Sequence, residues 1–260
     1  MLYRVARYRR RVVAENLARA FPEETPARRL EIERRFYAFF CDLLVESVKT
    51  LTISPEKLRQ RVVLKNMDLF ENYFRAGQNL LVVMGHLGNW EWAGGRFAGQ
   101  SPFELQVIYR PLQNRWFDRL VFRMRARLGM TPVPMRQTLR TLLAHREKKT
   151  ITTFIADQTP PPETAHWMRF LNQETPVFTG AEKLAVRLGY PVVFAGVRRL
   201  RRGFYEVYFE ELTTAPTRTS PAEITEKFNR RLERAICEQP EIWLWSHRRW
   251  KHRKRENTKP

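Results

Sequence analysis

Apolar residues recur along the chain in two alternating patterns. Short apolar runs of strand length are separated by longer segments in which apolar residues return every three or four positions. The runs predict strands at residues 62–64, 80–84, 105–109, around 133, 150–155, 191–197 and 204–209. The longer segments predict helices at residues 67–75, 89–97, 115–128, 137–146, 179–188 and 222–238. Strands alternating with helices predict an α/β fold with a single mixed sheet flanked by helices.

The region before the first predicted strand has the helical pattern throughout. Residues 2–20 place apolar side chains at helical spacing between arginines, which predicts a basic amphipathic helix. Such a helix either lies on anionic lipid or packs its apolar stripe on the core, and the sequence leaves both alternatives open. Thr25 then caps a second helix with Pro26 at its first position. We therefore predict a helical N-terminal extension, residues 1–52, that packs on an α/β catalytic domain, residues 53–260.

The net charge of the chain indicates more about its binding partners than about its fold. Lys and Arg number 47 and Asp and Glu 27, so the formal net charge is +20. This favours an anionic partner: nucleic acid, an acidic membrane or a phosphorylated substrate. No helix-turn-helix, zinc or RNA-binding signature is present, so a basic nucleic-acid-binding protein is the weaker alternative. A membrane-crossing helix needs about 20 apolar residues, and the longest apolar runs have only strand length.

The two cysteines, Cys41 and Cys237, are far apart in the sequence. Their spacing matches no metal site or disulfide framework, which favours a reducing compartment. Neither has a histidine beside it in sequence, so no cysteine nucleophile is predicted. We expect no metal and no cofactor.

The strongest candidate for chemistry follows the predicted strand at residues 80–84. His86 comes directly after Gly85, and sites in α/β sheets lie beyond the carboxyl ends of strands. Gly88 permits a bend through which Glu91, in the first turn of the next helix, reaches the imidazole. We predict that Glu91 holds one nitrogen of His86 while the other faces the substrate, which is the arrangement of general base catalysis.

Other polar residues lie at strand ends or helix starts. Arg110 ends a predicted strand, and we expect it near His86, in contact with phosphate or an oxyanion. Asp157 also ends a strand and either binds substrate on the same rim or caps a loop. Asn89, together with backbone N–H groups at the helix start, is a candidate oxyanion donor, and Gly88 is a further candidate for the same site.

Two further pairs of residues are weaker candidates. Thr179 and Gly180 open a helix, where they bind phosphate or, by the favoured interpretation, cap the helix. Arg125 and Arg127 lie on a predicted helix, and we interpret them as part of its solvated face.

Residues 243–255 interleave tryptophans with basic residues. Aromatic and cationic side chains together suit a membrane headgroup interface, and they equally suit nucleic acid. We predict contacts with anionic headgroups from Trp243, Trp245, Arg248, Arg249, Trp250 and Lys251.

Several of these stretches together resemble one family. The run GHLGNWE at residues 85–91 resembles the H-x-x-x-x-[DE] box of the lysophospholipid acyltransferase superfamily. Its form is similar to that of the late acyltransferases of lipid A biosynthesis, the lauroyl and myristoyl transferases. Further similar segments lie at residues 8–24, 109–111, 156–158, 178–180 and 240–253 (PEIWLWSHRRWKHR).

The resemblance implies an acyltransferase-like fold and direct acyl transfer without an acyl-enzyme intermediate. The donor would be an acyl-carrier-protein thioester, and the acceptor a hydroxyl of a lipid A precursor, with His86 as the base. An apolar groove for the fatty chain is expected beside His86. The implied location is the cytoplasmic face of the inner membrane of a Gram-negative bacterium, peripheral or through a hydrophobic N-terminal helix that relatives carry. Transfer from acyl-CoA to another (glyco)phospholipid is the nearer alternative.

Overall fold

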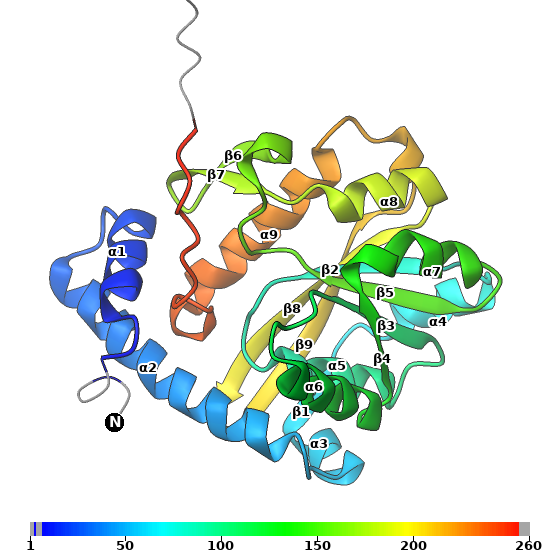
Figure 1. The fold of residues 1–260 in the computed structure, drawn as a ribbon, viewed down its shortest axis with the longest axis horizontal. Helices are drawn as coiled ribbons and strands as arrows, with labels where there is room; N and C mark the ends of the chain where they lie inside the picture. Colours follow the sequence, from blue (N-terminus) through cyan, green and yellow to red (C-terminus); the bar gives the residue numbers. More distant parts are fainter. Residues whose placement is uncertain (1–2, 4–6, 255–260) are drawn as a thin grey trace, which may run out of the picture.

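A seven-stranded sheet forms the centre of the computed structural model, which describes residue 3 and residues 7–254 (Figure 1). Its order is β1-β9-β8-β2-β5-β3-β4, and all neighbours are parallel except β8 and β9. The strands are β1 (Val62–Leu64), β2 (Leu80–Met84), β3 (Glu104–Tyr109), β4 (Met130–Pro134), β5 (Thr150–Ile155), β8 (Val192–Arg201) and β9 (Phe204–Thr213). The predicted mixed α/β sheet is confirmed.

Helices cover both faces of this sheet. On one face, Val82 and Met84 of β2 line a pocket together with Phe97 of α5. On the other face, Gly85 lies against Leu232 of α9. The two faces differ because successive residues of a strand point to opposite sides of the sheet. The helices are α1 (Arg10–Ala20), α2 (Pro26–Lys49), α3 (Pro55–Arg61), α4 (Asp68–Arg75), α5 (Trp90–Ala98), α6 (Arg115–Arg127), α7 (Thr138–Ala144), α8 (Gly180–Leu188) and α9 (Glu223–Glu238). Short 3₁₀ turns lie at Met135–Gln137, Pro162–Thr164, Pro216–Arg218 and Pro240–Ile242.

A two-stranded hairpin, β6 (His166–Phe170) and β7 (Gln173–Val177), was not predicted. Its tight turn holds Leu171 and Asn172 at φ 47° and 61°. Both angles are positive, as the turns that suit a two-residue hairpin require. Polar residues and Pro176 interrupt the strand pattern there, so the sequence gives little strand signal.

The apolar stripe of α1 packs on the core. Val12, Val13 and Leu17 are buried, and the same buried cluster joins α1 and α2 to the sheet. Of the two alternatives for this segment, packing on the core is confirmed and an apolar face on lipid is wrong. The helix begins only at Arg10, and residues 2 and 4–6 of the predicted helix lie outside the described residues.

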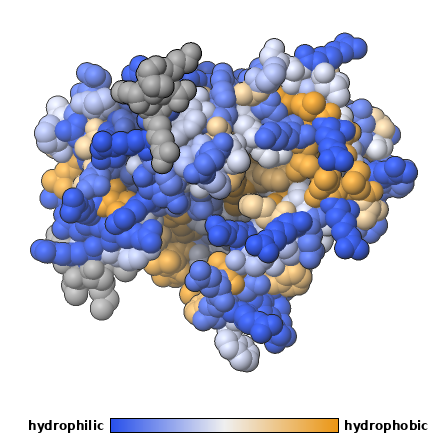
Figure 2. All heavy atoms as spheres, turned by 45° about the horizontal axis from the view of Figure 1, so that its top comes forward, coloured by the Kyte–Doolittle hydropathy of each residue, from blue (hydrophilic) through white to orange (hydrophobic). Residues whose placement is uncertain are grey.

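The surface is largely hydrophilic on the face that Figure 2 displays, with apolar patches around a hollow near its centre. In the described part of the chain, no helix combines the length and the apolar content that crossing a bilayer requires.

Candidate active site

His86 and Asp157 lie side by side at the carboxyl edge of the sheet. β2 and β5 pair in parallel with Met84 opposite Ile155, so the residues two positions further on, His86 and Asp157, are also neighbours. The His86 imidazole and the Asp157 carboxylate are joined by a contact of 2.6 Å between Nδ1 and Oδ1. The backbone N–H of His86 and the indole N–H of Trp243 each donate to Oδ2 at 2.8 Å. The predicted place of Asp157 on the His86 rim is confirmed.

These contacts keep Asp157 ionised. Burial of its carboxyl acts to raise the pKa, but the His86 charge and the hydrogen bonds from His86 and Trp243 outweigh it and hold the pKa at about 2. An ionised carboxylate only accepts hydrogen bonds, so Nδ1 of His86 carries the proton that it donates to Asp157. In the neutral imidazole Nε2 is then unprotonated. The His86 side chain retains 16% of its exposure, so the ring is accessible.

The expectation that Glu91 holds the imidazole is wrong. Glu91 binds Arg125 instead, with Nε at 3.0 Å from Oε2 and Nη2 at 2.6 Å from Oε1. Both side chains are 13% exposed, so Arg125 is not on a solvated helix face as expected. The neighbouring Arg127 is also engaged, donating through Nη2 to the carbonyls of Thr50 and Ile53.

The loop between His86 and α5 is fixed by its own polar groups. Gly88 has φ +55°, and a Cβ there would lie 2.6 Å from Val197, so the bend requires glycine. Its N–H donates to the carbonyl of Ile242. Asn89 is buried, caps α5 through Oδ1, and donates from Nδ2 to Glu46 at 2.9 Å. The expected oxyanion donors at Gly88 and Asn89 are therefore already occupied.

A buried carboxylate from α2 supports this loop. Glu46 accepts from Asn89 and from the hydroxyl of Tyr205 at 2.7 Å. Burial raises the pKa of Glu46, against the opposing effect of these two hydrogen bonds. Burial raises the pKa of Tyr205 as well, with the Glu46 charge adding to the effect. Helix α2 thus helps to hold the loop that follows His86 in place.

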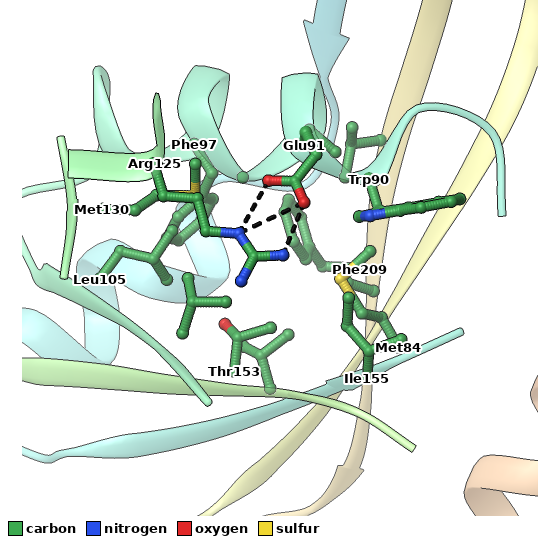
Figure 3. Close-up of a pocket in the computed structure, with 16 residues that line it drawn as sticks. Met84, Trp90, Glu91, Phe97, Leu105, Arg125, Met130, Thr153, Ile155 and Phe209 are labelled. Atoms are coloured by element: carbon green, nitrogen blue, oxygen red, sulfur yellow. Dashed lines mark hydrogen bonds and ion pairs between the residues drawn. The ribbon is translucent and has the colours of Figure 1, made fainter. Parts of the chain in front are cut away.

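An apolar pocket lies between α5 and the sheet, and Figure 3 shows the side chains that line it. Met84 and Trp90 line it, and the Trp90 indole meets the His86 ring edge to face with centroids 4.8 Å apart. The polar lining groups are few: Glu91, Arg125 and Thr153. An apolar pocket is therefore connected to His86 through Trp90, although His86 itself does not line it, and the long groove expected for a fatty chain stays a prediction.

The tryptophans of residues 243–250 belong to the core. Trp243, Trp245 and Trp250 are 3%, 0% and 8% exposed, so their predicted contact with headgroups is wrong. They pack on one another and on neighbouring aromatic rings. Arg248 and Lys251 are exposed, and nothing tests their predicted role.

Arg249 is 1% exposed, which also contradicts its assignment to the membrane face. None of its guanidinium nitrogens has a hydrogen-bond partner among the described residues. Burial lowers its pKa to about 10, against the opposing effect of the Asp157 charge. Burial also lowers the pKa of His247 to about 4, with Arg249 adding to the effect, so His247 is neutral at pH 7.

The remaining candidates lie apart from His86. Arg110 is exposed and, within residues 7–254, makes no side-chain hydrogen bond or ion pair; β5 separates its strand from β2. Thr179 is the N-cap residue of α8, but its hydroxyl makes no capping hydrogen bond, and Gly180 begins the helix. Among the described residues, no three His, Cys, Asp or Glu side chains are grouped as metal ligands.

The chain matches a known protein family over most of its length. A family model described as bacterial lipid A biosynthesis acyltransferase matches residues 1–252 of the chain. A search of curated proteins finds no match.

Proposed function

Because the chain belongs to the bacterial lipid A biosynthesis acyltransferase family, we propose that it transfers a fatty acyl group from an acyl-carrier-protein thioester to a hydroxyl of a lipid A precursor. The observation that supports this most directly is the hydrogen-bonded pair of His86 and Asp157 beside an apolar pocket.

His86 acts as the general base. Asp157 accepts the Nδ1 proton and fixes the ring, which leaves Nε2 to take the proton of the acceptor hydroxyl. As that proton leaves, the hydroxyl oxygen attacks the carbonyl carbon of the thioester. The C–S bond then breaks, and the imidazolium returns its proton to the departing sulfur. Asp157 stabilises the imidazolium between these two steps.

Glu91 acts through Arg125. It binds Nε and Nη2 of the guanidinium, so that the remaining nitrogen faces the pocket (Figure 3). A fixed cationic donor at this wall stabilises the negative charge that develops on the thioester oxygen. The motif acid therefore positions an arginine, while Asp157 positions the histidine.

The pocket takes the acyl chain. Its walls are mostly apolar side chains from α5 and from the strands β2, β3, β4, β5, β8 and β9, and α6 contributes only the polar Arg125. Each methylene removed from water contributes about 0.8 kcal/mol, so pocket depth sets the preferred chain length. We place the reaction at the anionic cytoplasmic face of the inner membrane, where a lipid A precursor presents its hydroxyls.

The test is an acyl-transfer assay with purified protein, acyl carrier protein charged with a fatty acid, and a lipid A precursor in detergent. We expect acylated lipid from the wild type and a loss of several orders of magnitude in His86→Ala. A matched control is His166→Ala, since His166 also pairs with a carboxylate, Glu226, at 2.8 Å, but outside the site. Acyl-CoA and a lysophospholipid are tested in parallel as the alternative donor and acceptor. An active His86→Ala protein would overturn the assignment.

A further inference from the structure

Helix α6 exposes large apolar side chains along most of its length. Trp116 is 79% exposed, Phe117 61%, Leu120 43% and Phe122 42%, and Leu112, just before the helix, is 48% exposed. On a water-facing helix these positions are normally polar, and an apolar patch of this kind marks an interaction surface.

Arginines share this exposed surface. Arg115, Arg119 and Arg123 are exposed and form no ion pair within the described residues. The acid of the helix, Asp118, is turned back to accept the backbone N–H of Leu112 at 2.9 Å. The outer surface of α6 is therefore apolar and cationic at once.

We propose that α6 is the surface through which the protein docks on an anionic lipid bilayer, an inference that rests on the proposed function. Tryptophan and arginine together suit the headgroup region, where the indole lies at the boundary and the cations meet lipid phosphates. An acidic protein partner would satisfy the arginines but would leave exposed Trp, Phe and Leu side chains without an apolar environment.

The place of α6 next to the pocket gives the docking a function. Its inner side carries Arg125, which lines the pocket and binds Glu91. A bilayer in contact with the outer surface of α6 therefore lies one helix away from the acyl cavity. Lipid substrate reaches the site from the membrane without crossing open water.

A second apolar patch provides a matched control. Val45 and Val48 of α2 are 68% and 69% exposed, yet the same helix turn carries no cluster of arginines. If exposed apolar area alone caused binding, this patch would matter as much as α6.

Vesicle flotation tests the proposal, with phosphatidylcholine vesicles that contain phosphatidylglycerol and with phosphatidylcholine alone. Replacing Arg115, Arg119 and Arg123 by Gln should lower the partition coefficient on anionic vesicles about 100-fold, which is about 3 kcal/mol. The variant Trp116→Ser/Phe117→Ser/Leu120→Ser should lose on the order of tenfold or more on both lipids. The control Val45→Ser/Val48→Ser should bind as the wild type does.

A second measurement does not depend on multiple substitutions. Brominated lipid should quench the fluorescence of Trp116, and the conservative variant Trp116→Leu should lose that quenching while it still binds. Unchanged binding of the Ser variant, loss of binding in the α2 control, or quenching that persists in Trp116→Leu would overturn the proposal. So would variants that bind vesicles normally but no longer bind acyl carrier protein, which would assign α6 to an acidic protein partner.

Acyl transfer in detergent separates this proposal from the proposed function. The α6 variants should keep wild-type activity there and lose it on vesicles. If the wild type transfers no acyl group in detergent, the proposed function fails, whereas the vesicle result still decides the role of α6.

Discussion

Replacing Asp157 by Asn tests the His86 pair most directly. The substitution keeps the size of the side chain but removes its charge and makes one of its two polar atoms a donor. With an amide N–H facing Nδ1, the ring carries its proton on Nε2, the nitrogen that must accept the hydroxyl proton. An equivalent exchange in a serine protease triad lowers kcat about 10⁴-fold, and we expect a loss of about 10³ to 10⁴-fold here.

The same variant should lose stability in a pH-dependent way. Asp157 has a pKa of about 2 in the fold against its usual 3.8, and 1.36 kcal/mol per unit makes this about 2 kcal/mol. Because the folded pKa is the lower one, this stabilisation is present above pH 3.8 and is lost as the pH falls to about 2. The difference in unfolding free energy between wild type and Asp157→Asn should therefore shrink over that window.

Acyl transfer under single-turnover conditions measures the loss of activity. Denaturant unfolding at pH 7 and below pH 3 measures the loss of stability and its pH dependence. Trp243→Phe is the control, since it removes one hydrogen bond to Asp157 and leaves both His86 contacts in place. We expect it to cost stability and little activity. Activity of Asp157→Asn within tenfold of wild type, or a stability difference that does not change with pH, would refute the pairing. The double variant with His86→Ala should be little worse than His86→Ala alone.

Three further outcomes follow from the structure. Glu91→Gln should lower both activity and stability, because it leaves the largely buried Arg125 unpaired. The double variant Glu91→Gln/Arg125→Met should recover the stability but not the activity. Denaturant unfolding measures the stability, and acyl transfer measures the activity. Gly94→Leu, on a pocket wall, should favour shorter acyl donors, by about fourfold in kcat/KM for each methylene excluded; unchanged chain preference would contradict the acyl pocket. Trp250→Ala should cost about 3 to 5 kcal/mol of unfolding free energy without altering vesicle binding of the folded protein, because this side chain lies in the core.

Most of the secondary structure could be predicted because its signals are local. The buried strand β2 is an uninterrupted apolar run, and α2 begins with Thr25 as cap and proline at its first position. Helix α3 was missed because its 7 residues hold a single buried side chain, Leu58. The hairpin of β6 and β7 was missed because its strands alternate weakly and its turn residues carry no glycine.

The partner of His86 could not be predicted, although its position could. The rule that sites lie beyond strand ends selects both His86 and Asp157, but only the order of strands makes them neighbours. That order places β5 beside β2 through long-range pairing that no local pattern encodes. Glu91 was assigned to His86 because it is the nearest acid in sequence. Arg125 directly follows the buried Met124 and precedes the buried Leu128 by three positions, a signal for burial that its charge obscured.

The hydrogen bonds that residues 243–249 make also have a consequence for the order in which the protein matures. The side chain of Asn16 donates to the carbonyl of Trp245, 229 residues away along the chain, and Trp243 reaches back 86 residues to Asp157. Closing such long loops is slow, because the chain loses entropy before the contacts repay it. During synthesis the His86 loop leaves the ribosome long before the residues that hold it exist. Activity should therefore appear only after residues 243–249 have left the ribosome, and a polypeptide that stops before Trp243 should not acylate lipid.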